Sequence, residues 1–219
     1  MEMKGYRKQR ERMVRLQLKN RGIVDERVLA VMQAVPRHCF VPDLYRDMAY
    51  ADAPLPIGHR QTISQPYIVA LMTQLLELNG RERVLEVGTG SGYQAAILSR
   101  LVKQVVTLER IPALAHQARS VLSELGYINI EVVDGDGSVV SGVSGLFDAA
   151  MVTAAAPSLP DPIKDVVKEG GQIVIPVGRR YSQSLQRWKN VNGAWQCEEI
   201  APVAFVPLIG RFGWETGEE

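Results

Sequence analysis

The chain has 219 residues, with 25 Lys and Arg against 24 Asp and Glu, for a formal net charge of +1. This length favours a single domain with a substantial core. The near-neutral charge argues against binding of nucleic acid that depends mainly on electrostatic attraction. No apolar run approaches the roughly 18 to 20 residues that cross a bilayer, and the charged N-terminus lacks the apolar core of a secretory signal. We therefore expect a cytoplasmic protein that neither binds nucleic acid nor enters a membrane.

The first 64 residues are expected to form a helical and loop-rich cap. Residues 4–20 space apolar side chains among Arg and Lys, which predicts an amphipathic helix that ends at Gly22. Asp25 is positioned as the N-cap of a second helix, which Pro36 ends. From Pro36 onward, four prolines predict an irregular but ordered segment, and a loop this long inside a compact domain is usually functional.

Histidines and cysteines give no sign of a metal site. His38 and His59 lack carboxylate or cysteine companions at metal-ligand spacing, so we expect structural histidines held by hydrogen bonds. Cys39 and Cys197 are far apart, which predicts buried free thiols rather than a disulfide or a zinc cluster.

The segment Gln61-Thr62-Ile63-Ser64-Gln65-Pro66 closes the cap and opens a helix to about Leu78. Ser64 is placed as its N-cap, where the hydroxyl would satisfy a helix amide and do nothing more. The same location also brings free backbone amides near a bound anion, so a functional role for Ser64 remains open at this point.

Residues 83–87 predict a buried strand, followed by a turn with glycines at positions 88, 90 and 92 and a helix from Tyr93 to Arg100. In a dinucleotide fingerprint, the third glycine comes one residue later, at the position of Tyr93, and allows the helix to pack closely on the strand. The bulky ring of Tyr93 does not allow such close packing. With Glu86, the turn forms an ExGxGxG pattern that is similar to the first motif of S-adenosylmethionine-dependent methyltransferases of the Rossmann-like class.

Three later strand ends carry candidate ligand residues. Glu109 ends a strand over residues 104–109, where an acidic side chain accepts ribose hydroxyls in adenosine sites of several kinds. After a strand at residues 130–133, Asp136 is placed to face an adenine amino group and Gly137 to bring an amide to the ring, although a plain Asp-Gly turn explains both residues as well. After residues 147–152, the loop from Thr153 lacks the Asn/Asp-Pro-Pro-aromatic motif of methyltransferases that act on base amino groups.

The C-terminal third predicts a strand at residues 172–177 and a hairpin around Asn192-Gly193, with arms at residues 184–188 and 194–198. Residues 203–208 are expected to add a last strand. The fold class is therefore α/β: an open, doubly wound, mostly parallel sheet of the Rossmann-like methyltransferase type, with a C-terminal antiparallel hairpin and an N-terminal helical cap. We expect one methyltransferase domain over residues 1–219, with the cap at 1–64 and the cofactor-binding sheet core at 65–219.

Seven short motifs together resemble the protein-L-isoaspartate (D-aspartate) O-methyltransferase family, and they cover nearly the whole chain. The TISQP segment is the most specific of them, whereas the glycine turn belongs to a whole superfamily. Two departures are visible: Arg60 stands where bacterial members have glycine, and residues 138–145 differ from theirs. The motifs are VPRH at 35–38, PLPIG at 54–58, QTISQP at 61–66, LEVGTGSGYQ at 85–94, GDG at 135–137, VTAA at 152–155 and IPVG at 175–178.

The resemblance implies transfer of a methyl group from S-adenosyl-L-methionine, leaving S-adenosyl-L-homocysteine, to the α-carboxylate of isoaspartyl and D-aspartyl residues in age-damaged proteins and peptides. The ester closes to a succinimide, some of which hydrolyses to normal aspartate, and no metal is involved. Ser64 matches the family's active-site serine. The resemblance assigns cofactor binding to Gln61, Thr62, Ile63, Ser64, Glu86, Gly88, Thr89, Gly90, Gly92, Glu109, Asp136 and Gly137, and substrate binding to Ser64, Thr153, Ala154 and Val177.

Two other classes of function are compatible with the same turn. A nicotinamide oxidoreductase would have to hold a pyrophosphate where Tyr93 stands, and a non-catalytic module on a methyltransferase fold would bind damaged peptide without turnover. We expect a monomeric enzyme.

Overall fold

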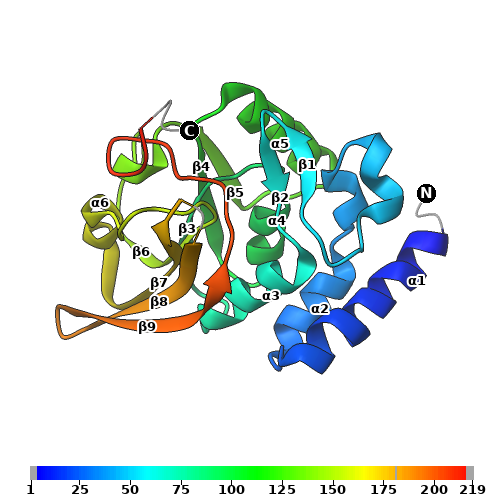
Figure 1. The fold of residues 1–219 in the computed structure, drawn as a ribbon, viewed down its shortest axis with the longest axis horizontal. Coiled ribbons are helices and arrows are strands. Elements are labelled where there is room, and N and C mark those ends of the chain that lie inside the picture. Colours follow the sequence, from blue (N-terminus) through cyan, green and yellow to red (C-terminus); the bar gives the residue numbers. More distant parts are fainter. Residues whose placement is uncertain (1–3, 181, 216–219) are drawn as a thin grey trace.

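The computed structural model describes residues 4–180 and 182–215, which form a twisted sheet with helices on both faces (Figure 1). The sheet has seven strands in the order β5-β4-β3-β6-β7-β8-β9. The strands from β3 to β7 pair in parallel, and β8 and β9 are antiparallel to their neighbours. These strands are β3 (Arg83–Val87), β4 (Gln104–Glu109), β5 (Ile130–Asp134), β6 (Phe147–Val152), β7 (Val167–Arg179), β8 (Ser182–Val191) and β9 (Ala194–Val203).

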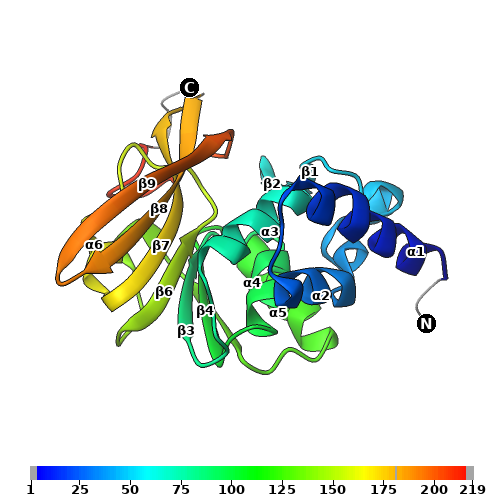
Figure 2. The same ribbon diagram turned by 90° about the horizontal axis from the view of Figure 1, so that it is seen from below.

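Two apolar clusters fill the two faces of the sheet. The larger lies under α3, α4 and α5 and continues beneath α1 and α2, whereas α6 covers the opposite face (Figure 2). The central strand β3 is apolar on both faces, because Val84 belongs to the first cluster and Leu85 and Val87 belong to the second. The helices are α1 (Lys4–Met13), α2 (Glu26–Ala34), α3 (Pro66–Leu75), α4 (Tyr93–Ser99), α5 (Pro112–Glu124) and α6 (Asp161–Asp165).

The N-terminal cap has more regular structure than its prolines predict. After α1, the helix continues as a π-turn to Leu18 and ends at Gly22, whose φ is 91°. Asp25 caps α2 as predicted, since its side chain accepts a hydrogen bond from the amide of Arg27 at 2.9 Å. Two 3-10 helices (Arg37–Phe40, Asp43–Met48) and a small hairpin, β1 (Leu55–Gly58) with β2 (Gln61–Ile63), occupy the segment that the sequence predicts to be irregular.

The C-terminal hairpin is longer than predicted, and the expected last strand at residues 203–208 is wrong. β9 ends at Val203, and beyond it the chain crosses back over the sheet with only isolated bridges, such as Ala155 to Pro207. We call residues 206–214 the C-terminal wall. The segment cannot extend the sheet because it lies against the loop after β6 rather than beside β9.

Three smaller expectations can be compared with the structure. His38 is a hydrogen-bonded structural histidine, as predicted, with Nδ1 at 2.8 Å from the Tyr50 hydroxyl. Cys39 and Cys197 form no disulfide among the described residues, but Cys39 is only partly buried and Cys197 is exposed on β9, so the predicted burial of both is wrong. Within the described part of the chain, no helix is both long and apolar enough to cross a bilayer.

Candidate active site

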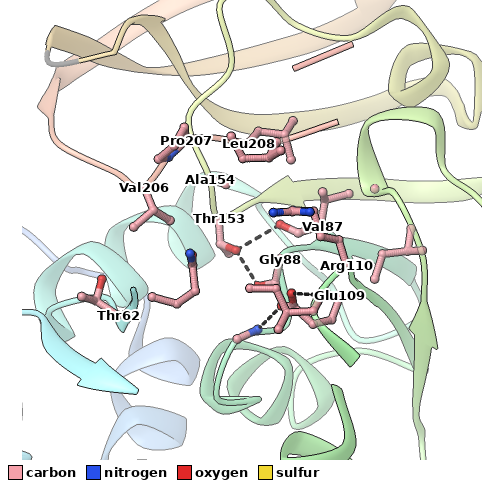
Figure 3. Close-up of a pocket in the computed structure, with 16 residues that line it drawn as sticks. Thr62, Val87, Gly88, Glu109, Arg110, Thr153, Ala154, Val206, Pro207 and Leu208 are labelled. Carbon is pink, nitrogen blue, oxygen red and sulfur yellow. Dashed lines mark hydrogen bonds between the residues drawn. The ribbon is translucent and has the colours of Figure 1, made fainter. Parts of the chain in front are cut away.

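The main pocket lies at the carboxyl ends of the parallel strands, where the sheet order reverses between β3 and β6 (Figure 3). This is the edge at which open α/β sheets bind ligands. The pocket encloses about 630 Å³, including its open mouth. Its lining residues are Gln61, Thr62, Val87, Gly88, Gly90, Leu108, Glu109, Arg110, Ile111, Gly137, Thr153, Ala154 and residues 206–209.

Gly88 begins the glycine turn and lies against the loop after β6. The Thr153 hydroxyl donates to the carbonyl of Gly88 at 2.6 Å, and a Cβ atom on Gly88 would approach that hydroxyl oxygen to 2.4 Å. With a φ of 97°, the position also has a backbone conformation that side chains rarely adopt. The close approach of Thr153 therefore requires glycine at position 88, whose bare backbone lines the pocket.

Glu109 ends β4 and fixes the turn through both of its carboxylate oxygens. Oε2 accepts from the amide of Gly90 at 2.8 Å, and Oε1 accepts from the amide of Ile111 at 2.9 Å. A carboxylate has about four acceptor positions, so each oxygen retains capacity for one more donor. Because Glu109 lines the pocket, this capacity suits a pair of ligand hydroxyls.

Glu86 is part of the glycine motif but lines none of the pockets around it. The residue has no exposed surface, and among the described residues neither carboxylate oxygen makes a geometrically good hydrogen bond. The hydroxyl of Thr107, its neighbour on β4, lies 2.7 Å from that of Thr89. Burial raises the pKa of Glu86 to about 8, and Thr107 opposes the rise only in part. Burial therefore favours the neutral, protonated form of Glu86 at pH 7.

Tyr93, at the position where a dinucleotide site has glycine, anchors the cap to the turn. Its buried ring packs edge-on against Phe40, with centroids 5.5 Å apart, and the guanidinium of Arg37 lies 4.9 Å from its centre. Arg37 is itself fully buried, which lowers its pKa to about 10, and its Nε donates to the carbonyl of Ala49 at 2.7 Å. The motif residue Arg37 thus joins the cap to the helix that follows the glycines.

Ser64 lines two further pockets that adjoin the main one. Thr62 and Thr153 line all three, so they mark the junction. The prediction that Ser64 caps the following helix is wrong: α3 begins at Pro66, its N-cap residue is Gln65, and the first-turn amide of Tyr67 donates to the Asp52 carboxylate at 3.2 Å instead. The helix starts later because Pro66 lacks an N–H and suits the first helical position. Among the described residues, the Ser64 hydroxyl has no hydrogen-bond partner, and Ser64 lines both of these pockets.

The structure brings together most, but not all, of the residues predicted for the site. Ile63 and Thr89 line the pocket beside Ser64. Gly92 instead packs against Leu122 of α5, and Val177 lies in β7 away from the pockets around Ser64 and the glycine turn. Asp136 lines a neighbouring cavity, whereas Gly137 of the same turn lines the main pocket.

The C-terminal segment builds a pocket wall that the sequence does not predict. Val206, Pro207 and Leu208 line the main pocket, and residues 202–206 line the pocket of Ser64. A run of apolar residues after a hairpin gives no signal that distinguishes a wall from a strand. Arg110 and Ile111, which follow Glu109, are also pocket residues that the sequence does not single out.

The two places where the sequence departs from the family, Arg60 and residues 138–145, lie next to residues that line these pockets. Arg60 and its neighbour His59 form the turn between β1 and β2 with φ values of 58° and 51°, a left-handed conformation that glycine adopts more readily. Between residues 138 and 145, Val140 has a φ of 54°, which is unusual for a β-branched side chain. No group of three or more potential metal ligands is found among the described residues.

A twisted parallel sheet with this glycine turn, a strand-end glutamate and a pocket at the switch point defines a Rossmann-like, S-adenosylmethionine-dependent methyltransferase. Comparison with known proteins identifies the family. The model of the protein-L-isoaspartate (D-aspartate) O-methyltransferase family matches residues 8–213. The chain therefore belongs to this family, and its activity is protein-L-isoaspartate O-methylation.

Individual relatives agree with the family match. The chain is 52% identical over 208 residues to a protein-L-isoaspartate O-methyltransferase of Methanoregula boonei, covering 95% of this chain and 96% of that one. It is 50% identical over 210 residues to that of Geobacter metallireducens, covering 95% and 97%. A Plasmodium falciparum structure of such an enzyme, in complex with S-adenosyl-L-homocysteine, superposes with a TM-score of 0.80 at 28% identity, covering 91% of this chain and 98% of that chain.

Proposed function

We propose that this enzyme esterifies the α-carboxylate of L-isoaspartyl and D-aspartyl residues in damaged proteins and peptides, with S-adenosyl-L-methionine as the methyl donor. The observation that carries the proposal is the pair of adjoining pockets joined at Thr62 and Thr153. One pocket holds the glycine turn and Glu109, and the other holds the unengaged hydroxyl of Ser64. A donor and an acceptor bound in these pockets would meet at the two threonines.

The residues of the main pocket suit the cofactor. When bound, S-adenosyl-L-methionine supplies a sulfonium methyl group that a carboxylate oxygen takes directly. Glu109 has the remaining acceptor capacity for two ribose hydroxyls, and Gly88 and Gly90 line the pocket with backbone alone, which a ligand can approach closely. Gly137 and Ile111 line the other end of the pocket, beside Leu208 and Ile209, where a flat apolar ring would fit.

The reaction requires no general base. The α-carboxylate of an isoaspartyl residue has a pKa near 3 to 4, so it is ionised at neutral pH. In the transfer, a carboxylate oxygen forms a bond to the methyl carbon as the carbon–sulfur bond breaks, and S-adenosyl-L-homocysteine leaves without any proton transfer. We assign Ser64 the task of orienting the carboxylate by a hydrogen bond, so that catalysis depends mainly on alignment.

The apolar part of the Ser64 pocket suits a peptide. Pro54 and Ile68 line it opposite Pro202 and Phe205, and Val203 and Val206 complete the wall. Thr153 lies at the junction, where the carboxylate would be held, and Ala154 lines the main pocket beside it, whereas Val177 would support this loop from β7 through its bridge to Ala156. The peptide chain would run between the cap and the C-terminal wall.

We further propose that residues 1–219 act as one domain, in which residues 1–64 cap the sheet core, and that the enzyme is a cytoplasmic monomer without nucleic-acid partners. The continuous apolar cluster beneath α1 to α5 supports a single folding unit. Sedimentation equilibrium with and without an isoaspartyl peptide tests the monomer.

The function is tested by transfer of labelled methyl from S-adenosyl-L-methionine to an isoaspartyl peptide and to its twin with a normal aspartate. We expect base-labile methyl ester on the isoaspartyl peptide and none above background on the twin. Equal labelling of both peptides, or binding of the isoaspartyl peptide without turnover, would contradict the proposal. A third peptide with D-aspartate at the same position tests the wider substrate range.

A further inference from the structure

The pocket of Ser64 is lined on one side by a segment that has just left the sheet. β9 ends at Val203, and residues 202–206, which we call the crossover, line this pocket. Val203 still pairs with Gln183 of β8, but the residues after it are no longer part of the ladder. The amide of Phe205 therefore needs a hydrogen-bond partner that no neighbouring strand provides.

Gln183 is that partner. Its side chain is buried, and its Oε1 accepts a hydrogen bond from the amide of Phe205 at 2.9 Å. Its Nε2 donates to the carbonyls of Arg179 and Arg180, at 3.0 and 2.6 Å, where β7 ends. Both ends of the Gln183 amide are therefore bonded, and this one side chain joins the end of β7 to the crossover.

The glycine of the IPVG motif shows how closely β8 approaches β7 at this place. Gly178 pairs with Gln183, and a Cβ atom on Gly178 would lie 2.5 Å from the carbonyl oxygen of Ser182 and 3.0 Å from the Cα atom of Gln183. Such distances require glycine, which allows a close approach of two backbones. The motif lines neither the main pocket nor the pocket of Ser64, so its glycine serves the contact between the strands that carry and hold Gln183.

The cofactor side of the same segment is held separately. The carbonyl of Val206 accepts from the amide of Ala155 at 2.8 Å, and the amide of Leu208 donates to the carbonyl of Ala155 at 2.7 Å. These bonds keep Val206 and Leu208 at the main pocket without Gln183. Phe205, by contrast, lines the pocket of Ser64 and not the main pocket. Loss of the Gln183 contact should therefore affect the peptide and spare the cofactor.

We propose that Gln183 is a positioning residue for the peptide substrate. Through the amide of Phe205 it holds the crossover opposite Pro54 and Ile68, at the width that the peptide chain requires, although Gln183 itself lines neither pocket. The proposal rests on the proposed function, which places the peptide in the pocket of Ser64.

The test measures kcat and KM for an isoaspartyl peptide at saturating S-adenosyl-L-methionine, the calorimetric Kd of S-adenosyl-L-homocysteine, the melting temperature, and hydrogen exchange of residues 203–206. Gln183→Met keeps the length of the side chain and removes its hydrogen bonds, whereas Gln183→Glu retains an acceptor oxygen for Phe205. Gln172→Met is the matched control, because Gln172 is a similarly buried glutamine of β7 whose Nε2 donates to Glu77 at 3.1 Å, near the amino end of β6.

We expect Gln183→Met to raise KM for the peptide by about three- to tenfold, the loss that corresponds to one hydrogen bond between uncharged groups, and to leave kcat within about twofold of wild type. The Kd of S-adenosyl-L-homocysteine should not change, and residues 203–206 should exchange faster. Gln183→Glu should raise KM less than Gln183→Met does. The control should melt at a lower temperature and keep the wild-type KM.

A role in stability alone would give a different pattern. Gln183→Met would then melt at a lower temperature with unchanged KM and unchanged exchange in residues 203–206, and this result would overturn the proposal. Equal weakening of cofactor and peptide binding would also overturn it, as would an equal KM in the Met and Glu variants, because the bond to Phe205 would then not matter. Failure of the wild-type protein to methylate the isoaspartyl peptide would instead contradict the proposed function, so the two failures are distinguishable.

Discussion

At the scale of single residues, the polar side chains around the pockets differ in how many hydrogen bonds they make within the protein. Thr153 is bound to the carbonyls of Val87 and Gly88, and Glu109 is bound to two backbone amides. The Ser64 hydroxyl has no hydrogen-bond partner among the described residues, and neither carboxylate oxygen of buried Glu86 makes a geometrically good hydrogen bond to them. Three predictions follow from these differences.

Ser64→Ala should lower kcat/KM for an isoaspartyl peptide by roughly 10- to 150-fold, because one charge-assisted hydrogen bond is worth about 1.5 to 3 kcal/mol and each 1.36 kcal/mol is a factor of ten in rate. Since Ser64 does not cap α3, the melting temperature and the affinity for S-adenosyl-L-homocysteine should remain near wild type. Ser120→Ala, which removes a hydroxyl bonded to Glu124 on the exposed side of α5, is the control. Near-normal kcat/KM in the Ser64 variant would remove the catalytic role.

Glu109→Ala should weaken binding of S-adenosyl-L-homocysteine by about 1.5 to 3 kcal/mol, measured by calorimetry, because hydrogen bonds to a charged acceptor have this value. Glu109→Gln retains one acceptor oxygen and should lose less. Since the carboxylate also holds the amides of Gly90 and Ile111, the alanine variant should melt at a lower temperature as well. Unchanged affinity would show that Glu109 does not bind the ribose hydroxyls.

Glu86→Gln should stabilise the cofactor-free protein increasingly as pH rises from 5 to 8. In this range the unfolded carboxyl is ionised, with a pKa near 4.5, whereas the folded one holds its proton up to about pH 8. Folding then takes up a proton, so wild-type stability falls with rising pH by up to about 1.4 kcal/mol per unit, and the glutamine variant lacks this loss. Urea unfolding at pH 5, 6.5 and 8 measures the difference in free energy of unfolding between the variant and the wild type. If this difference does not change with pH, the assignment of a protonated Glu86 is contradicted.

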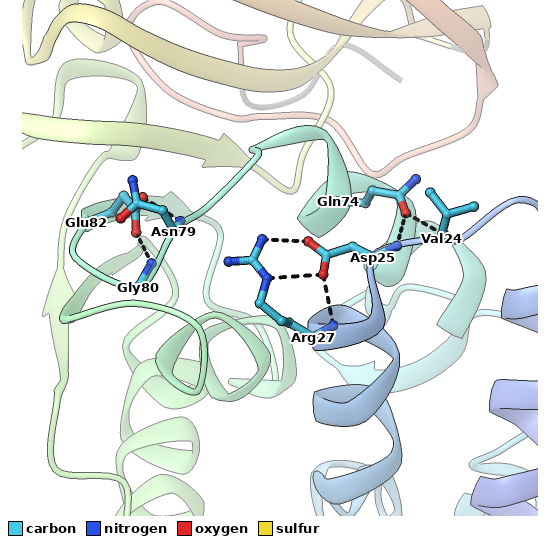
Figure 4. Close-up of polar contacts among 7 residues, drawn as sticks. All are labelled: Val24, Asp25, Arg27, Gln74, Asn79, Gly80 and Glu82. Carbon is cyan, nitrogen blue, oxygen red and sulfur yellow. Dashed lines mark hydrogen bonds and ion pairs between the residues drawn. The ribbon is translucent and has the colours of Figure 1, made fainter.

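At the scale of elements, the two Asn-Gly steps lie in different surroundings. Asn192 and Gly193 form the exposed tip of the β8–β9 hairpin, with φ values of 52° and 80° that are typical of a type I′ turn. At the other step, the Glu82 carboxylate accepts from the amides of Asn79 and Gly80 at 2.7 and 2.8 Å, as Figure 4 shows.

Isoaspartate should therefore form at Asn192 before it forms at Asn79. Its formation requires the glycine nitrogen to attack the preceding side chain, and at Gly80 the N–H is already bound to Glu82. Peptide mapping by mass spectrometry after prolonged warm storage measures both sites, and the aged enzyme should then methylate itself. Glu82→Ala should raise the rate at Asn79 and leave Asn192 as before. Isoaspartate at Asn79 alone would contradict the prediction.

At the scale of the whole molecule, three distant parts of the chain enclose one site. The cap contributes Gln61 to Ser64, the sheet contributes its strand ends, and the C-terminal wall contributes residues 206–209. The pockets exist only when all three parts are in place, so a ligand bound there should stabilise all three together.

S-adenosyl-L-homocysteine at 100 times its Kd should add about 2.7 kcal/mol to the free energy of unfolding. Hydrogen exchange should slow in residues 55–64 and 206–212 as well as in the glycine turn. NADH is the control and should leave both the melting temperature and exchange unchanged. Protection limited to the glycine turn would show that the cap and the wall do not enclose the ligand.

The sequence by itself determined the parts of the site that depend on neighbours in the chain. The strand at residues 83–87, the glycine turn, Glu109 at a strand end and the Asn192-Gly193 hairpin all follow from periodicity and turn chemistry within a few residues, and the parallel sheet follows from their alternation. The match of TISQP to its family then indicated Ser64.

Only the tertiary structure decided what those residues contact. Ser64 does not cap α3, because this helix starts at Pro66. Glu86 is fully buried, because α3 and α4 cover β3. The Asp136 carboxylate accepts a hydrogen bond from the amide of Arg211, which lies 75 positions later in the chain. The C-terminal wall has no local signature, since its shape comes from hydrogen bonds to two loops at the far edge of the sheet. Patterns in sequence report local backbone preference and burial, whereas a bond between Asp136 and Arg211 exists only after the sheet has brought them together.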